Sequence, residues 1–226
     1  MHPAGDSLDA DADLLKVSKA MVITNFERSI PSRPVYGELT PRAGSAHLIV
    51  ADGEGGDAVA DLFAKAGADA PAMKAATQII YIPGANGTDF SLAVQNLGAA
   101  QFYRGPSFAA AQSRLAKVLA DAHVGLQIYT SGTEGLMAQV AAAAQAAGYI
   151  YEAVQMEHRG SHARRVQCVH CKGVTENVTT DPFTCSHCGL SLFVRDHFSR
   201  RLAAFQGVNI DAEDPGLVPA TVERFK

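Results

Sequence analysis

The sequence predicts an α/β fold, with a five-stranded parallel sheet followed by a small thiolate-metal ribbon. Between residues 46 and 160, short apolar runs alternate with stretches whose apolar residues recur at helical spacing. Strands that alternate with helices require right-handed crossovers, which produce a parallel sheet covered on both faces. All four cysteines lie between Cys168 and Cys188, in two CxxC pairs. The 226 residues are enough for one medium-sized domain and one small module.

The charge balance argues against two classes of partner. The chain has 19 Lys and Arg against 23 Asp and Glu, so it has no basic field to bind nucleic acid or an anionic membrane. The first residues, MHPAGDSLDADADLLKV, lack the charged and apolar regions of a signal peptide, and no apolar run approaches about 18 residues. We expect a soluble cytoplasmic protein. Thiols stay reduced in that compartment, so the CxxC pairs indicate a metal site rather than disulfides.

Residues 1–45 are predicted to form a partly extended leader segment rather than a domain. Residues 1–16 are rich in Asp, Ala and Gly, and the following residues place one short apolar run among three prolines. The proline-rich part, Ile30–Pro41, has two interpretations. It lies across a neighbouring subunit, or it is a plain surface linker.

The domain of residues 46–160 is predicted to supply the five strands and the helices between them. The first strand is AHLIVAD, from Ala46, and the helix after the GEGG turn ends at Gly67. The second strand, QIIYIPG, precedes a helix that Thr88 can cap and Gly98 can end. The later strands are AQFYRG, VGLQIYTSG and YIYEAVQME, the last of which ends near His158. The helices between them are PSFAAAQSRLAKVLADA and TEGLMAQVAAAAQAAG.

The loops at residues 52–56 and 130–135 are the predicted ligand-binding loops, because parallel sheets bind ligands at the carboxyl ends of strands where the strand order reverses. Glycine backbones there could approach a pyrophosphate, such as that of NADPH, at a helix N-terminus. The candidate nucleotide-binding residues are Gly53, Gly55, Gly56, Ser131 and Gly132. The flanking carboxylates of residues 52, 54 and 57 oppose this, since each repels an anion by roughly 1–4 kcal/mol at about 4 Å. A glycine-rich turn is also a common structural device.

The two CxxC pairs predict a metal site. Zinc and iron both accept four thiolates tetrahedrally, and each CxxC turn can direct two sulfurs at one ion. The predicted ligands are Cys168, Cys171, Cys185 and Cys188. Without a metal, a module of about 30 residues has too little core to fold. Four thiolates leave no open coordination position, so the ion is expected to hold shape or pass one electron rather than activate water.

The spacing of the pairs favours zinc over iron. Rubredoxin-type iron sites separate their pairs further and place Gly directly after both, whereas Lys172 follows the first pair here and Gly189 the second. His170 and His187, inside the turns, are interpreted as solvated. Basic residues that would offset the charge of either centre are Arg164, Arg165, Lys172 and Arg195. No catalytic constellation is predicted, because Ser131 lacks a GxSxG context and no HExxH is present.

Residues 164–208 are predicted to form the metal ribbon and to include a short helix at 197–207. Phe198, Leu202 and Phe205 lie on one stripe of that helix. The stripe packs on its own domain, or it anchors a partner subunit while Arg200 and Arg201 pair with partner carboxylates. Residues 209–226 are predicted to form a C-terminal tail.

Two stretches resemble known proteins. Gly125–His158, GLQIYTSGTEGLMAQVAAAAQAAGYIYEAVQMEH, resembles the nicotinamide-binding half of ferredoxin reductases of the phthalate dioxygenase reductase type. Ser131 stands in place of that family's loop Cys, and Thr133 in place of its Pro. Cys185–Val208, CSHCGLSLFVRDHFSRRLAAFQGV, with the upstream CxxC pair, resembles the C-terminal domain of DmmA-like subunits of dimethylamine monooxygenase. The first resemblance implies a sheet of ferredoxin-reductase NAD-binding type, without the preceding flavin barrel.

The second resemblance implies a role in a multi-subunit enzyme that uses NADPH and O2 to convert dimethylamine to methylamine and formaldehyde. The implied partner subunits carry heme, FMN and a [2Fe-2S] cluster, and a further one is associated with tetrahydrofolate. This chain would act in assembly or electron relay, without a complete active site of its own. Two alternatives remain. One is a free-standing NAD(P)H-dependent reductase that passes electrons through a rubredoxin-like iron site, and the other is a zinc-ribbon adaptor without a redox role.

Overall fold

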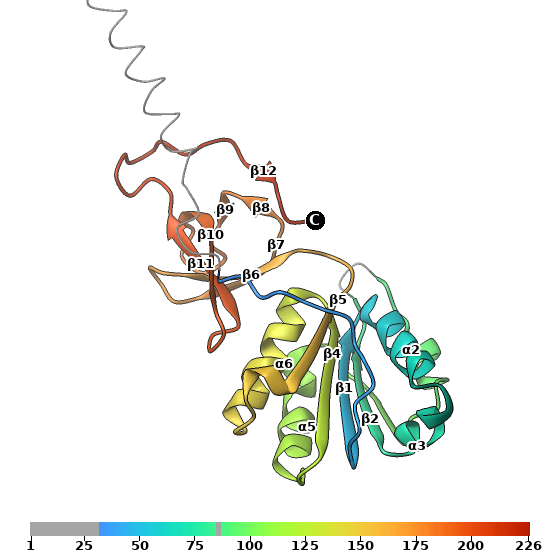
Figure 1. Cartoon of the computed structure of the whole chain (residues 1–226). Coiled ribbons are helices and arrows are strands. Elements are labelled where there is room, and N and C mark those ends of the chain that lie inside the picture. Colours follow the sequence, from blue (N-terminus) through green and yellow to red (C-terminus); the bar gives the residue numbers. More distant parts are fainter. Residues whose placement is uncertain (1–31, 85–86) are drawn as a thin grey trace, which may run out of the picture. The chain divides into compact units, whose positions relative to one another are not determined.

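The computed structural model describes residues 32–84 and 87–226 and confirms the predicted α/β fold with its parallel sheet (Figure 1). Strands and helices alternate up to residue 158, and an all-β part follows. The elements of the first part are β1 (Ala46–Asp52), α2 (Gly55–Ala66), η1 (Gly67–Asp69), α3 (Ala70–Ala75), β2 (Thr77–Ile82), α4 (Ser91–Gln95), β3 (Gln101–Arg104), α5 (Phe108–Ala120), β4 (Leu126–Gly132), α6 (Glu134–Ala146), η2 (Tyr151–Ala153) and β5 (Val154–His158).

The five strands of the first part form one parallel sheet in the order β3-β2-β1-β4-β5. β1 pairs with β2 on one side and β4 on the other, so Val50 lies opposite both Ile80 and Thr130. The strand order reverses between β1 and β4. The carboxyl ends of these two strands therefore meet at the switch point, where sheets of this kind bind their ligands.

Both faces of the sheet are buried, which explains why its central strands are continuous apolar runs. In β1, Ile49 and Ala51 belong to the core cluster that includes α2, whereas Leu48 and Val50 belong to the cluster that includes α5 and α6. Figure 1 shows α2 and α3 on one side of the sheet and α5 and α6 on the other. This division follows from the strand geometry, in which successive side chains point to opposite faces.

The helix expected between Thr88 and Gly98 is shorter in the structure. It is α4, and Thr88 does not cap it. Instead, the Asp89 carboxylate accepts a hydrogen bond from the Ser91 amide at 2.9 Å. Asp89 therefore fixes the start of the helix, as Asp commonly does at turns before helices.

Residues 32–44 form an extended strap along the edge strand β5; the part of the predicted leader before residue 32 lies outside the described residues. The Gly37 amide donates to the Met156 carbonyl at 3.2 Å, and the Leu39 amide donates to the buried Glu157 carboxylate at 2.7 Å. The Leu39 side chain is fully buried in the core cluster on the α2 side of the sheet. This part of the leader therefore packs on its own chain and covers a sheet edge that would otherwise be open.

The all-β part is a ribbon whose main sheet has the order β7-β6-β11-β10-β9. Its core contains Val166, Leu192 and Phe205, together with Ala138 of α6 and Phe225 near the end of the chain. The strands are β6 (Arg164–Cys168), β7 (Val174–Val178), β8 (Thr180–Asp181), β9 (Phe183–Thr184), β10 (Ser191–Ser199), β11 (Ala204–Asn209) and β12 (Val222–Glu223). β12 pairs with β8, so the last residues of the predicted tail return to the ribbon.

The prediction of a helix at residues 197–207 is wrong, because this segment forms the end of β10, the hairpin turn and the start of β11. Phe198 and Phe205 are cross-strand partners, with ring centroids 5.1 Å apart. A spacing of seven suits one face of a helix, but it equally suits two residues opposite each other across a turn. Leu192 and Val194 are buried at alternate positions of β10, which is the pattern of a strand. The apparent helical stripe further along the chain led to the wrong prediction.

Among the residues that the structure describes, no helix has both the length and the apolar composition needed to cross a membrane.

Replacing Leu39 by Ala should lower the free energy of unfolding by about 2–5 kcal/mol, because it leaves a cavity in the core. Glu38→Ala is the matched control, since Glu38 is exposed and pairs with Lys65 on the surface. Urea unfolding followed by circular dichroism measures both variants. Equal stabilities for the two would show that the strap is not part of the core.

Candidate functional site

The four cysteines converge into one cluster, as the sequence predicts. Their sulfurs all lie within 4.8 Å of one another, with Cys168 Sγ 3.9 Å from Cys188 Sγ and Cys171 Sγ 3.8 Å from Cys185 Sγ. These separations are far longer than a disulfide bond. Four sulfurs at about 2.3 Å from a central ion in a tetrahedron would lie about 3.8 Å apart. The cluster therefore has the size of a four-thiolate metal site, for zinc or for iron.

The two CxxC turns have the same backbone geometry. In the first, the Lys172 amide donates to the Cys168 carbonyl and the Cys168 amide to the Gly173 carbonyl, both at 2.9 Å. In the second, Gly189 and Leu190 make the equivalent bonds with Cys185 at 3.0 and 2.9 Å. Lys172 and Gly189 both have positive φ, at 65° and 76°. The position after the first pair thus adopts the left-handed conformation even though it is not glycine, so sequence alone does not reveal the equivalence of the turns.

Backbone amides stabilise negative charge on the sulfurs. Burial raises the pKa of the Cys185 thiol, but hydrogen bonds from the Cys188 and His187 amides and from neighbouring thiols overcome burial and lower the pKa to about 6. At Cys188 the Leu190 amide lowers the pKa, yet burial and the three neighbouring thiols raise it to about 12. Without a cation the Cys188 thiol therefore keeps its proton at neutral pH. A bound cation would favour the thiolate instead.

The basic residues expected to offset the charge of the metal centre have other contacts. Arg165 pairs with Glu176 at 2.8 Å and donates to the Leu202 carbonyl, and the Lys172 ammonium donates to the Val169 carbonyl at 2.6 Å. His187 is exposed, and its Nε2 lies 2.9 Å from the Val174 carbonyl oxygen. Neither His187 nor His170 belongs to the metal-binding group found among the described residues.

The predicted nucleotide-binding residues also come together, at the switch point of the sheet, but they contact one another there. The Ser131 hydroxyl is buried and donates to the Gly55 carbonyl at 2.8 Å. A Cβ atom at Gly55 would overlap the Ser131 carbonyl, and one at Gly56 would lie 2.8 Å from Phe90 Cβ. Gly53 has positive φ and donates its amide to the Ile82 carbonyl at 3.0 Å. These glycines permit close packing of α2 against the strands.

An internal carboxylate occupies the start of α6. Asp52, the last residue of β1, accepts hydrogen bonds from the Thr133 amide at 2.8 Å and from the Thr133 hydroxyl at 2.6 Å. A Cβ atom at Gly132 would overlap this carboxylate. Burial raises the pKa of Asp52, and the bonds from Thr133 oppose that rise. Asp52 thus takes the place at a helix N-terminus that a phosphate or another anionic ligand takes in a nucleotide site.

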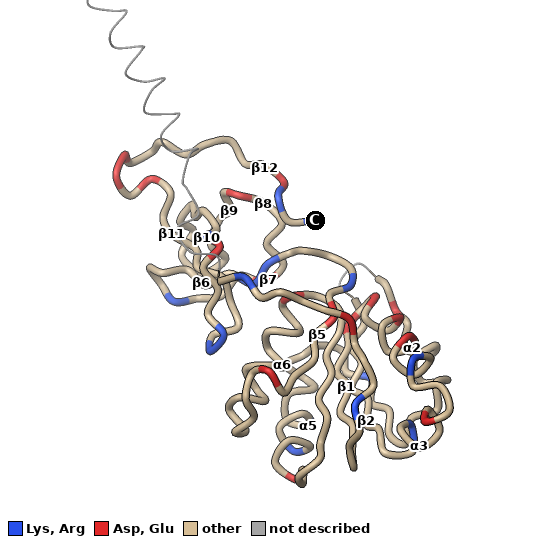
Figure 2. The backbone as a smooth tube through the Cα atoms, viewed as in Figure 1, with Lys and Arg blue, Asp and Glu red and all other residues tan. Residues whose placement is uncertain are grey.

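The residues at the switch point therefore do not fit the pyrophosphate of NADPH. The donors of Thr133 are already satisfied by Asp52, and a bound phosphate would lie beside that carboxylate. Figure 2 shows Asp and Glu positions grouped near the start of α2 and the end of β5. Acidic groups at this edge of the sheet include Asp52, Glu54 and Glu157.

A buried acidic group that the sequence did not reveal lies beside the switch point. Glu134, at the start of α6, is 2% exposed, and Arg33 of the strap donates to its Oε1 at 3.0 Å. Burial raises the pKa of the Tyr36 hydroxyl, and the nearby Glu134 charge raises it further. The rings of Tyr36 and His158 stack with centroids 6.0 Å apart. No local pattern could have predicted this group, because Arg33 and Glu134 are separated by 101 positions.

Comparison with protein families identifies the chain. A family model described as the dimethylamine monooxygenase subunit DmmA-like N-terminal domain matches residues 28–154, and the corresponding C-terminal domain matches residues 165–208. The chain belongs to the DmmA-like family. The metal cluster lies within the second match, and the switch point lies within the first.

One curated relative supports this assignment. The DmmA-like chain is 32% identical over 192 residues to the heme-dependent oxidative N-demethylase delta subunit of Ectopseudomonas mendocina (strain ymp), which covers 85% of this chain and 94% of that one. Among solved structures, phthalate dioxygenase reductase matches with a TM-score of 0.38 and 13% identity over 65% of this chain and 47% of that chain. Flavohemoglobin from Malassezia yamatoensis matches with a TM-score of 0.36 and 12% identity over 52% and 32%.

We expect the purified DmmA-like chain to contain one metal ion, measured by elemental analysis, and Cys185→Ser to lose it. The variant ribbon should then become sensitive to protease, because a structural ion stabilises such a module, by on the order of 10–16 kcal/mol where the ion is zinc. Ser186→Ala, in the same turn, is the control and should retain the ion. A metal-free chain with an ordered ribbon would contradict this prediction.

Asp52→Asn should lower the free energy of unfolding by about 1–3 kcal/mol, because it weakens charge-assisted bonds to Thr133 in a buried site. Asp57→Asn, at an exposed position in the first turn of α2, should change it little. In a fluorescence titration the wild-type chain should not bind NADPH saturably at millimolar concentration. Saturable binding that Asp52→Asn alters and Asp57→Asn does not would show that the switch point accepts a nucleotide.

Proposed function

We propose that this chain is a zinc-stabilised assembly subunit of a heme-dependent dimethylamine monooxygenase. That enzyme would convert dimethylamine, O2, NADPH and a proton to methylamine, formaldehyde, NADP⁺ and water. Heme, flavin and [2Fe-2S] groups would reside on partner subunits, as would the site associated with tetrahydrofolate. The observation that carries the proposal is the 32% identity to a heme-dependent oxidative N-demethylase delta subunit, a match that covers 94% of that protein.

The contacts at the switch point support assembly rather than hydride transfer by this chain. Asp52 satisfies the donors of Thr133, and Ser131 bonds to Gly55, so the loops bind each other. Such a subunit would bind its partners through its folded surface and would not itself transfer hydride. The nicotinamide cofactor would then be bound elsewhere in the assembly.

The ribbon is proposed to hold zinc through Cys168, Cys171, Cys185 and Cys188. Cys168 and Cys185 are buried, whereas Cys188 is exposed. Four thiolates close the coordination shell of zinc, which then holds the ribbon strands together without redox chemistry. The proposal places the chain in the cytoplasm, where thiols remain reduced.

Iron at the same position is the basis of the second candidate function, an electron relay. The sulfur separations of 3.8 and 3.9 Å suit iron as well as zinc. An iron-loaded ribbon would take one electron and pass it on, and Cys188, the exposed ligand, would be the exit point. The purified chain would then be red and show thiolate-to-iron absorption, whereas the zinc form is colourless.

Reconstitution with the partner subunits tests the proposed function. The chain should co-elute with the heme and flavin subunits in size-exclusion chromatography and should increase NADPH-dependent formaldehyde release from dimethylamine. Cys185→Ser should abolish co-elution, and Ser186→Ala should preserve it, because only the former removes a metal ligand. An isolated chain that neither associates with the other subunits nor affects their turnover would contradict the proposal.

A further inference from the structure

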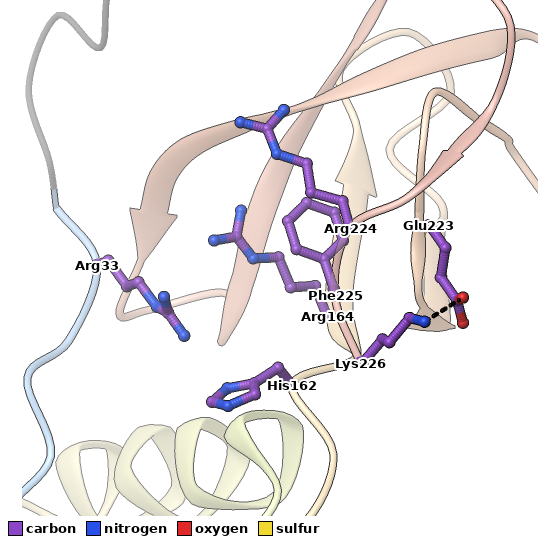
Figure 3. Close-up of a pocket in the computed structure, with 7 residues that line it drawn as sticks. All are labelled: Arg33, His162, Arg164, Glu223, Arg224, Phe225 and Lys226. Carbon is purple, nitrogen blue, oxygen red and sulfur yellow. Dashed lines mark ion pairs between the residues drawn. The ribbon is translucent and has the colours of Figure 1, made fainter.

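A pocket of about 400 Å³ lies apart from the cysteine cluster, between the strap, the segment before β6 and the end of the chain (Figure 3). Volumes of this order accommodate small ligands or single side chains. Figure 3 shows Arg33 and Arg164 extending from opposite walls of the pocket, with the His162 ring below them. The residues that line the pocket, apart from Glu223, are Arg33, His162, Arg164, Arg224, Phe225 and Lys226.

Arg164 is held rigidly in one wall. Its side chain is 5% exposed, its guanidinium lies 4.1 Å from the ring centroids of both Phe205 and Phe225, and it pairs with Asp196 at 2.7 Å. Stacking between two rings fixes the plane of the guanidinium. The buried Arg164 Nε has no hydrogen-bond partner among the described residues. The guanidinium is thus positioned in advance at the pocket wall, and its Nε–H is left without a partner among the described residues.

The pocket offers hydrogen-bond donors without a large excess of positive charge. Its four cations also pair within the chain, as Arg33–Glu134, Arg164–Asp196, Arg224–Asp181 and Lys226–Glu223. Arginine has five N–H donors, and Arg33 directs its Nε and one Nη to a single oxygen of Glu134, so further donors remain. A polyphosphate would meet the carboxylates of these pairs, whereas a singly charged, planar group matches the arginine forks.

The surroundings of His162 agree with a site for a weakly charged acceptor. Burial lowers the pKa of His162, and the neighbouring His158 and Arg33 lower it further, although Glu134 acts in the opposite direction. The imidazole is therefore neutral at pH 7 and can either donate or accept a hydrogen bond. Arg224 and Lys226 have side chains 52% and 75% exposed, so the pocket is open to solvent at its rim.

We propose that this pocket binds a single carboxylate group between Arg33 and Arg164. The carboxylate comes from a free organic acid or from an acidic residue of another protein. The proposal does not depend on the metal in the ribbon or on the N-demethylase assignment. It assigns a role to residues that the proposed assembly function leaves unused.

Titration of the full-length chain tests the carboxylate site. Acetate, and separately a peptide ending in Asp and Glu, would be added at constant ionic strength while amide NMR shifts near His162 and Phe225 are followed. Inorganic phosphate is the competing probe. Saturable shifts with acetate or with the peptide support the site, and stronger binding of the peptide identifies a protein as the source. Absence of saturation with both, or stronger binding of phosphate, overturns the proposal.

Single substitutions test which residues bind the carboxylate. Arg33→Gln should weaken carboxylate binding by about tenfold or more, because it removes a charge-assisted bidentate donor. Arg224→Gln, at the rim, provides an independent test that leaves the strap intact, and it should weaken binding less. Lys117→Gln is the control, since Lys117 is an exposed cation that also pairs with an aspartate, on α5. Equal affinities in Arg33→Gln and Lys117→Gln would overturn the proposal, provided that the spectra show both variants folded.

Discussion

Two hydrogen bonds between Asp52 and Thr133 occupy the position where a parallel sheet of this kind would bind a ligand. They join the end of β1 to the start of α6 across the position where the strand order reverses. Helix N-termini attract anions, and in this chain the anion is a side chain of the protein itself. Because Asp52 satisfies the amide and hydroxyl donors of Thr133, this helix N-terminus does not offer those donors to a nucleotide phosphate.

The strap of residues 32–44 packs along the edge strand β5. It buries Leu39, places Arg33 against the buried Glu134, and contacts β5 through one main-chain hydrogen bond and through bonds from its amides to β5 side chains. An exposed sheet edge invites pairing with another chain, so a covered edge directs partners to other surfaces. Ser32 also bonds to the Phe198 amide at 2.6 Å, which ties the strap to the ribbon hairpin. The ribbon is therefore connected to the sheet by more than its linker.

The ribbon depends on its sulfur cluster because its apolar core is small. The core gathers around Val166, Leu192 and Phe205, and it is completed by Phe225 from the end of the chain. Arg164 lies inside this core as a cation between two aromatic rings and needs Asp196 to offset its charge. A buried cation of this kind contributes specificity more reliably than stability. The pocket that Arg164 lines and the cysteine cluster both belong to this part of the chain.

The local pattern of the sequence predicted the α/β class, the five strands, the position of the switch-point loops and the four cysteines. These features depend on residues close together in the chain, through short apolar runs, helical spacing, glycine turns and the reach of a CxxC pair. The hairpin around Phe198 and Phe205 was not predictable in this way, because their spacing suits both a helix stripe and a cross-strand pair.

Tertiary structure alone decided which groups meet. Asp52 reaches Thr133 across 81 positions, Arg33 reaches Glu134 across 101, and the end of the chain returns to the ribbon. Such contacts depend on strand order and crossover geometry, which bring distant residues together. No local spacing in the sequence predicts them. The sequence determined that glycines and acidic residues would lie at the carboxyl edge of the sheet. Only the tertiary structure decided that one of those acids, Asp52, would accept the hydrogen bonds of Thr133.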